Sequence, residues 1–95
     1  MQITISSNSV NISGNIKSIN DYQEIKEKIG SLVTQHKSIT IIVENSLSIT
    51  SSVIGYLNKI VLKDGIEITM KVGNSQLMEL LEDLSLTSVF NARMI

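Results

Sequence analysis

The sequence contains no cysteine, no proline and no tryptophan, and its 95 residues include one histidine. Without cysteine, the chain has no disulfide, no thiolate metal ligand and no thiol nucleophile. A lone histidine, His36, excludes a multi-histidine metal cluster and most catalytic triads. We therefore expect a protein that is not an enzyme and that has neither a metal site nor a cofactor.

Charge is also scarce, because 18% of the residues are charged and the formal net charge is −1. A nucleic-acid-binding protein needs a basic face, and this sequence does not provide one. No run of about 18 apolar residues is present, so we expect no direct membrane insertion. Residues 1–7 do not combine a basic segment with an apolar one, so we expect no secretory signal. The composition predicts a small soluble protein of the cytoplasm.

Hydrophobic residues make up 42% of the chain, which is enough for one folded domain over residues 1–95 but leaves no room for two. Apolar residues alternate with polar ones over residues 2–6, and again at Val10 and Ile12, on either side of a polar cluster at 7–9. Two short alternating runs of this kind predict a β-hairpin or two adjacent strands.

Apolar residues then recur at helical spacing and predict a helix over residues 20–36, with Ser18 or Asn20 as its N-cap. Ser38–Glu44 is β-branched and almost continuously apolar, which is typical of a strand covered on both faces. The remaining elements are expected as a helix over Ser51–Lys63, a strand over Ile66–Val72, a helix capped by Asn74 or Ser75, and a tail over Leu86–Ile95 that closes the core as a helical turn and an edge strand.

This order of strands and helices predicts an α/β fold. Two strand–helix–strand crossovers imply a largely parallel or mixed sheet, and each crossover should be right-handed. We expect one mixed sheet of four to five strands, with three or more helices mainly on one face.

The stretch from Ser46 to Leu57 places several hydroxyl groups at the start of the helix predicted from Ser51. The first turn of a helix has free N–H groups and a partial positive charge, which stabilise a phosphate. Phosphorylation would add about −1.5 to −2 charges at pH 7 to a nearly uncharged surface, which is enough to repel a partner that docks on apolar atoms. Ser52 is the candidate for this modification, and the alternative is an ordinary first-turn serine.

The same stretch resembles the STAS domain, the fold of bacterial anti-sigma-factor antagonists and of the cytoplasmic domains of sulfate transporters. The family has a loop that ends in Asp-Ser-Ser-Gly-Leu-Gly before a helix, and the matching run here is Thr50-Ser51-Ser52-Val53-Ile54-Gly55. Ile12–Ile16 is similar to the family's Leu-Ser-Gly-Glu-Leu segment, and residues 65–90 are similar to its C-terminal strand, helix and closing segment. Thr50 and Val53 stand where the family has aspartate and glycine.

The resemblance implies a non-enzymatic regulatory module of the anti-sigma-factor-antagonist type, which docks a partner protein through the loop and helix start around Ser52. In such antagonists an anti-sigma-type serine kinase is the partner and phosphorylates the serine that matches Ser52. The expected partner-binding residues are Ser48, Thr50, Ser51, Ser52, Val53, Ile54, Gly55 and Tyr56.

Two alternatives stay open. The first is a STAS subunit that is not phosphorylated and that stabilises a transporter or a sensory complex, a reading motivated by Thr50 and Val53. The second is nucleotide binding at the same helix start, which the absence of a basic side chain in the loop disfavours.

Overall fold

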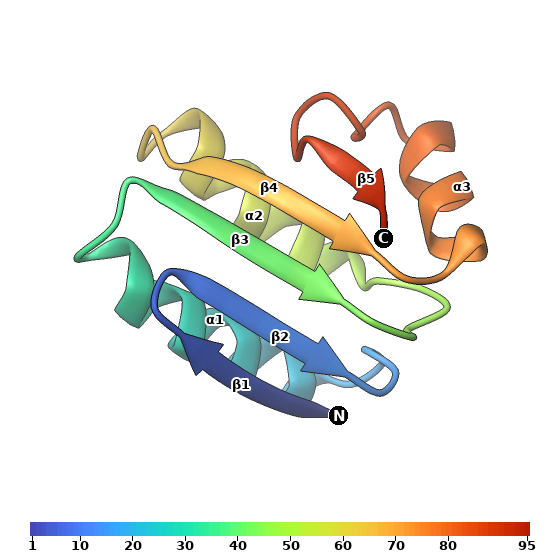
Figure 1. Cartoon of the computed structure of the whole chain (residues 1–95), viewed down its shortest axis with the longest axis horizontal. Helices are drawn as coiled ribbons and strands as arrows, with labels where there is room; N and C mark the ends of the chain where they lie inside the picture. Colours follow the sequence, from blue (N-terminus) through green and yellow to red (C-terminus); the bar gives the residue numbers. More distant parts are fainter.

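A computed structural model describes all residues, 1–95, as five strands and three helices (Figure 1). The strands are β1 (Gln2–Ser6), β2 (Ser9–Ser13), β3 (Ser38–Val43), β4 (Glu67–Val72) and β5 (Ala92–Met94). The helices are α1 (Ile19–Val33), α2 (Ser51–Leu62) and α3 (Ser75–Asp83). The α/β class and the order of elements predicted from the sequence are confirmed.

All five strands form one mixed sheet in the order β1-β2-β3-β4-β5. β1 and β2 are the expected antiparallel hairpin, and every other neighbouring pair is parallel. Each parallel strand is added on the same side of the strand before it, so right-handed crossovers place their helices on the same face of the sheet. α1 and α2 accordingly lie together behind the sheet in Figure 1, and α3 packs against β4 and β5.

The core lies between the helices and one face of the sheet. Alternate residues of the two central strands point into it and are buried, namely Ile39, Ile41, Val43, Ile68, Met70 and Val72. Phe90, the single phenylalanine of the chain, is fully buried and comes from the turn that precedes β5. The tail therefore closes the core with a single helical turn and an edge strand, as predicted, because the Phe90 N–H donates to the Leu86 carbonyl oxygen, four residues earlier, at 3.0 Å.

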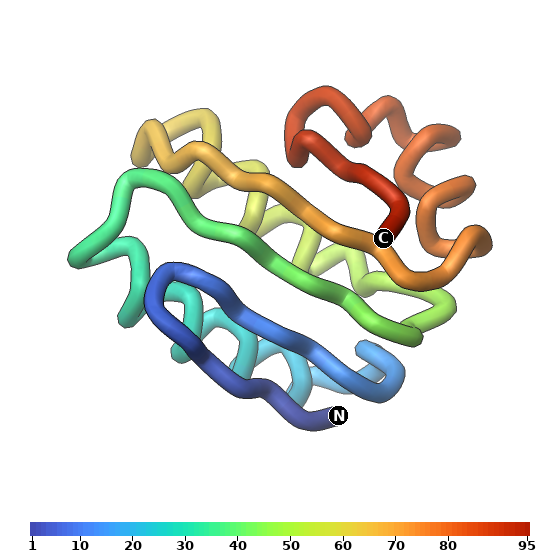
Figure 2. The backbone as a smooth tube through the Cα atoms, viewed as in Figure 1, coloured from blue at the N-terminus to red at the C-terminus, as the bar shows by residue number.

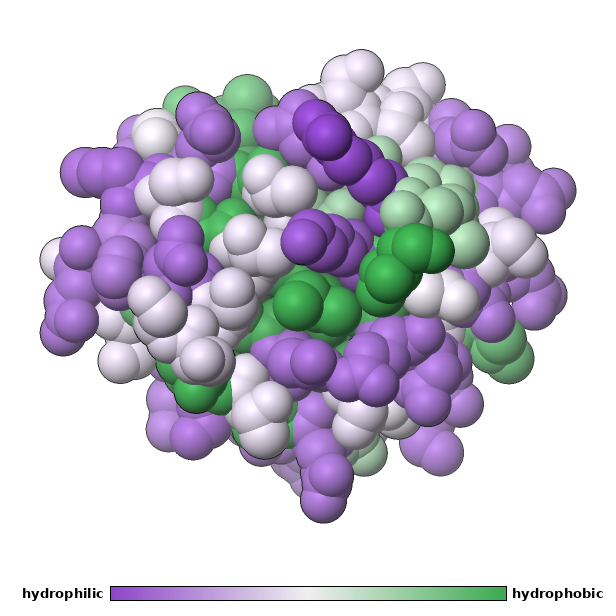
Figure 3. All heavy atoms as spheres, viewed as in Figure 1, coloured by the Kyte–Doolittle hydropathy of each residue, from purple (hydrophilic) through white to green (hydrophobic).

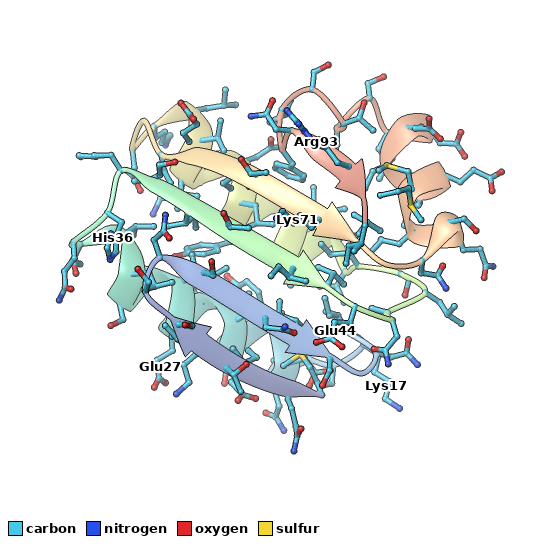
Figure 4. The ribbon with its side chains drawn as sticks, in the orientation of Figure 1. Lys17, Glu27, His36, Glu44, Lys71 and Arg93 are labelled. Carbon is cyan, nitrogen blue, oxygen red and sulfur yellow. The ribbon has the colours of Figure 1, made fainter.

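The other face of the sheet is open. Thr40 and Ile42 of β3 point to this face and are partly exposed, so the prediction that residues 38–44 are covered on both faces is wrong. The reason is the strand order, which sends every crossover helix to the opposite face. Most of the open face is polar (Figure 3), and Lys71 and Arg93 lie beside each other on it in register (Figure 4).

The start of α1 is set by local hydrogen bonds. Ser18 is the N-cap, because its hydroxyl oxygen accepts the Asp21 N–H, while the Asp21 carboxylate accepts the backbone N–H groups of Ser18 and Lys17. These reciprocal bonds form a capping box, and they decide for Ser18 over Asn20. The helix ends at Val33, so His36 lies beyond it and not in its last turn.

No helix combines the length and the apolar content that a membrane span requires.

The capping box makes the stability of the protein depend on pH. The hydrogen bond from the Lys17 N–H holds the pKa of Asp21 below its ordinary value of 3.8, against a smaller opposing effect of burial, and Ser18 lowers it further. Because the folded-state pKa is the lower one, this stabilisation is complete above pH 3.8 and is lost as the pH falls through the folded-state value. We expect an NMR titration to place the Asp21 carboxyl midpoint below 3.8 in the folded protein. A midpoint at or above that value would contradict the capping box.

Candidate functional site

α2 begins at the carboxyl end of β3, after a loop over residues 44–50. Thr50 is its N-cap, with an extended backbone and a hydroxyl oxygen that accepts the Val53 N–H at 3.3 Å. Ser51 and Ser52 are therefore the first two residues of the helix, and both are exposed. Ser52 thus lies at the surface, as the phosphorylation hypothesis requires.

The structure divides the predicted partner-binding residues into two groups. Val53 and Tyr56 are 1% and 9% exposed, so their side chains belong to the core beneath α2. An apolar docking patch that includes these two side chains is therefore not formed, because helix positions three apart share a face and this face packs on the sheet. The predicted residues that remain at the surface, fully or in part, are Ser48, Thr50, Ser51, Ser52, Ile54 and Gly55.

Tyr56 holds α2 against α1. Its hydroxyl donates to the Lys26 carbonyl oxygen at 3.5 Å and lies near Gly30, where a Cβ would be in ordinary van der Waals contact with it. Burial raises the pKa of Tyr56 above the ordinary value of 10.0, and the Asp64 carboxylate adds to this shift. The hydroxyl therefore stays neutral and remains a hydrogen-bond donor at neutral pH.

The loop before α2 is bound to the loop before α1, and we call residues 13–18 and 44–50 the clamped loops. They follow β2 and β3 and run side by side at one end of the sheet (Figure 2). Backbone N–H groups of one loop donate to side-chain oxygens of the other, and this happens in both directions. The bonds run from Gly14 to Asn45 Oδ1 at 2.7 Å, from Ile16 to Ser46 Oγ at 3.0 Å and from Leu47 to Asn15 Oδ1 at 3.0 Å.

Ser46 is the one polar residue of the chain that is fully buried. Its hydroxyl accepts the Ile16 N–H and donates to the Ser48 carbonyl oxygen at 2.6 Å, so it ties the two loops together and also shapes its own loop. The sequence gives no signal for this role, because Ser46 is one serine among many. The adjacent Leu47 is 49% exposed and belongs to the loop predicted to dock a partner, although it was not among the expected partner-binding residues.

A third loop meets the same end of the sheet at Gly73. Its N–H donates to the Val43 carbonyl oxygen at 2.9 Å, and a Cβ at this position would clash with the carbonyl oxygen of Glu44. Only glycine allows the two backbones to approach so closely. The start of α3 is thereby fixed next to the loop that leads into α2.

At position 55, by contrast, no close approach within the fold requires glycine. It lies in the interior of α2, it is exposed, and nothing is found within 4 Å of the position that a Cβ would take. Glycine in a helix interior costs about 1 kcal/mol relative to alanine. Because residues three apart are neighbours on a helix surface, Gly55 leaves bare backbone beside Ser52.

The chain segment that contains Ser52 carries no charge. No charged residue occurs between Glu44 and Lys59, and the first turn of α2 contains no acidic side chain. No pocket opens on the molecule, and no three histidine, aspartate or glutamate side chains gather into a group that could hold a metal. The candidate site is therefore an open surface built from an uncharged segment that is rich in hydroxyl groups.

Removing the Ser46 hydroxyl tests the clamped loops. We expect Ser46→Ala to lower the free energy of unfolding by about 1–3 kcal/mol, because the buried Ile16 N–H loses its acceptor. Urea unfolding followed by circular dichroism measures this loss. Ser48→Ala is the matched control, since Ser48 takes part through its carbonyl oxygen and its side chain is exposed. Equal stability of the two variants would contradict the role given to Ser46.

The geometry of the candidate site can also be set beside known proteins. No protein-family model, no curated protein and no solved structure matches this chain.

Proposed function

We propose that this protein is a non-enzymatic regulatory binding module of the anti-sigma-factor-antagonist type, with a STAS-like domain that acts in the cytoplasm. It docks a partner protein, an anti-sigma-type serine kinase, through the loop and helix start around Ser52. We call this docking region the α2 surface, and it comprises Leu47, Ser48, Thr50, Ser51, Ser52, Ile54 and Gly55. Phosphorylation of Ser52 switches docking off.

The observation that carries this proposal is Gly55. An exposed glycine inside a helix destabilises the fold by about 1 kcal/mol, and nothing in the protein's own packing requires it. Bare helix backbone lets another molecule approach more closely than any side chain would allow. Ile54 supplies apolar atoms next to this position, and the exposed Leu47 adds apolar surface in the loop before α2. Apolar contact area stabilises association where charge pairs are absent.

The environment of Ser52 supports the switch. Ser52 is the second residue of α2, where backbone N–H groups have no partner within the helix and favour an anion. A phosphate would therefore be tolerated by the fold itself. In a complex, the same phosphate would have to leave water and lie against an uncharged, partly apolar surface, which is strongly unfavourable without a cationic partner. Modification of one hydroxyl would thus separate the folded protein from its partner without unfolding it.

One observation favours the alternative, in which the same surface docks permanently on a transporter or a sensory complex. The Thr50 hydroxyl is used to cap α2, and this residue stands where the STAS family has aspartate. No carboxylate is therefore present in the first turn to orient the Ser52 hydroxyl for phosphate transfer. In this alternative Ser52 is a surface hydroxyl within the interface and carries no phosphate.

Charge at position 52 tests docking. We expect Ser52→Asp to retain at most one tenth of the partner that the wild type captures from native cells, and a tenfold loss corresponds to about 1.4 kcal/mol. Quantitative mass spectrometry of the captured proteins measures this ratio. Ser75→Asp is the matched control, because Ser75 is an exposed first-turn serine of α3 and should leave capture unchanged. Capture that is equal for all three proteins would exclude the α2 surface, and phosphate on Ser52 in native protein would exclude the permanent subunit.

We expect Gly55→Ala to raise the stability of the protein and to weaken docking of the partner. The substitution should raise the free energy of unfolding by about 1 kcal/mol, since the new methyl group meets open space and alanine favours the helix. It should also weaken capture of the partner, because the methyl group blocks the approach to the backbone. Thermal unfolding and the capture assay measure the two effects. A variant that is more stable and binds equally well would remove Gly55 from the interface.

A further inference from the structure

β1 forms one rim of the sheet and pairs only with β2 (Figure 1). Its register with β2 is continuous over all five residues, so the strand has no bulge, and it contains no charged residue, no proline and no glycine. Natural edge strands carry charged residues, proline or a bulge, or are covered by a loop, and these devices prevent pairing with another chain. β1 is mostly exposed and has none of them.

The opposite rim is protected in the usual way. β5 is three residues long and carries Arg93 at its centre, so it offers a short and charged edge. Protection of one rim and not of the other indicates that β1 is an edge with a partner.

The hydrogen bonds of β2 identify which groups of β1 are free. The Thr40 N–H donates to the Asn8 carbonyl oxygen, and the Glu44 N–H donates to the Ile12 carbonyl oxygen. The even-numbered residues in and next to β2 therefore direct their backbone groups toward β3. Successive residues of a strand direct their backbone groups to opposite sides, so the odd-numbered residues of β2 bond to their even-numbered partners in β1. The odd-numbered residues of β1 therefore direct their N–H and C=O groups out of the sheet.

We propose that β1 pairs with β1 of a second copy of this chain, antiparallel and about a two-fold axis at Thr4. In this register Ile3 of each copy lies opposite Ile5 of the other, and the two pairs exchange four hydrogen bonds through the outward backbone groups. Thr4 lies opposite its own copy, and Gln2 lies opposite Ser6. The result is one continuous sheet made of both copies.

The side chains favour this register. Ile3 is partly buried and Ile5 is 42% exposed, and both lie on the face of the sheet that the helices cover. Pairing brings four isoleucines together on this face and leaves threonine, serine and glutamine on the open face. A shift by one residue would place isoleucine against polar side chains, and a shift by two would leave one isoleucine opposite its own copy in place of two isoleucine pairs. The pattern therefore favours this register. A single strand is a narrow interface, so the dimer forms at high protein concentration and dissociates on dilution.

The pairing is independent of the proposed function, because no residue of the α2 surface belongs to β1. A second copy of the chain suits β1 for a physical reason. The sequence Gln-Ile-Thr-Ile-Ser has its isoleucines placed symmetrically about Thr4, and it brings no like charges together when it meets itself.

Sedimentation equilibrium from micromolar to millimolar protein tests the dimer. We expect the mean mass to rise toward twice the monomer value for the wild type and to stay at the monomer value for two variants. Ile5→Pro removes an outward N–H while leaving the bonds to β2 intact, and Thr4→Lys places two ammonium groups opposite each other. Ser88→Lys is the control for added charge, since it is exposed and precedes the opposite rim, and it should dimerise as the wild type does. Circular dichroism establishes that each variant is folded.

Amide hydrogen exchange gives a readout that does not depend on variants. Protection of the Ile3 and Ile5 N–H groups should increase at least tenfold from dilute to concentrated protein, while that of Thr4 and Ser6 stays constant. A monomer at all concentrations would overturn the proposal. A dimer that persists in both variants, with unchanged exchange at Ile3 and Ile5, would also overturn it, because another surface would then be responsible.

Discussion

The backbone N–H groups of Gly14, Ile16 and Leu47 all donate to side-chain oxygens of the neighbouring loop, and the position of α2 depends on these bonds. β2 and β3 end here, so their backbones lose the sheet ladder as a source of hydrogen-bond partners. The clamped loops replace the ladder with two asparagine side chains and one buried serine hydroxyl. The helix start around Ser52 is therefore held from behind, and its exposed side remains available.

The order of strands explains both faces of the molecule. Because each strand after β2 is added on the same side, all crossover helices share one face and the other face stays open. α1 connects β2 to β3 and lies behind the sheet, so it covers a face of the sheet and not the rim formed by β1. Nothing in the chain is then left to cover the β1 rim. The core, the open face and the unprotected edge are thus consequences of a single topological choice.

Much of the fold could be predicted from the sequence, because periodicity records which side of an element is buried. The alternation in residues 2–13 and the helical spacing of Ile25, Ile29 and Leu32 describe local geometry that the structure retains. The prediction that residues 38–44 are buried on both faces was wrong, because burial of a strand also depends on how the helices are distributed and not on local periodicity alone. A continuous apolar run does not reveal how many helices are present to cover it. Ser38 and Thr40 were the polar residues of β3 that marked the open face.

The candidate site was predicted less well, because it depends on how α2 is rotated about its axis. Val53 and Tyr56 were included in the docking patch, although their spacing with Leu57 and Ile60 already places all four on one helix face. Ser52 and Gly55 lie on the other side of the helix and are exposed. Ser46 could not be found, because a buried serine and an exposed one look alike in sequence, and only the Ile16 N–H and the Ser48 carbonyl oxygen reveal the difference.

The agreement between strand order and chain order has a consequence for synthesis on the ribosome. Each strand joins the free edge of the sheet that its predecessors have already built, and no strand has to enter between two that are paired. The nascent chain can therefore assemble in the direction in which it emerges. The turn with Phe90 emerges after α3 and fills the remaining space in the interior.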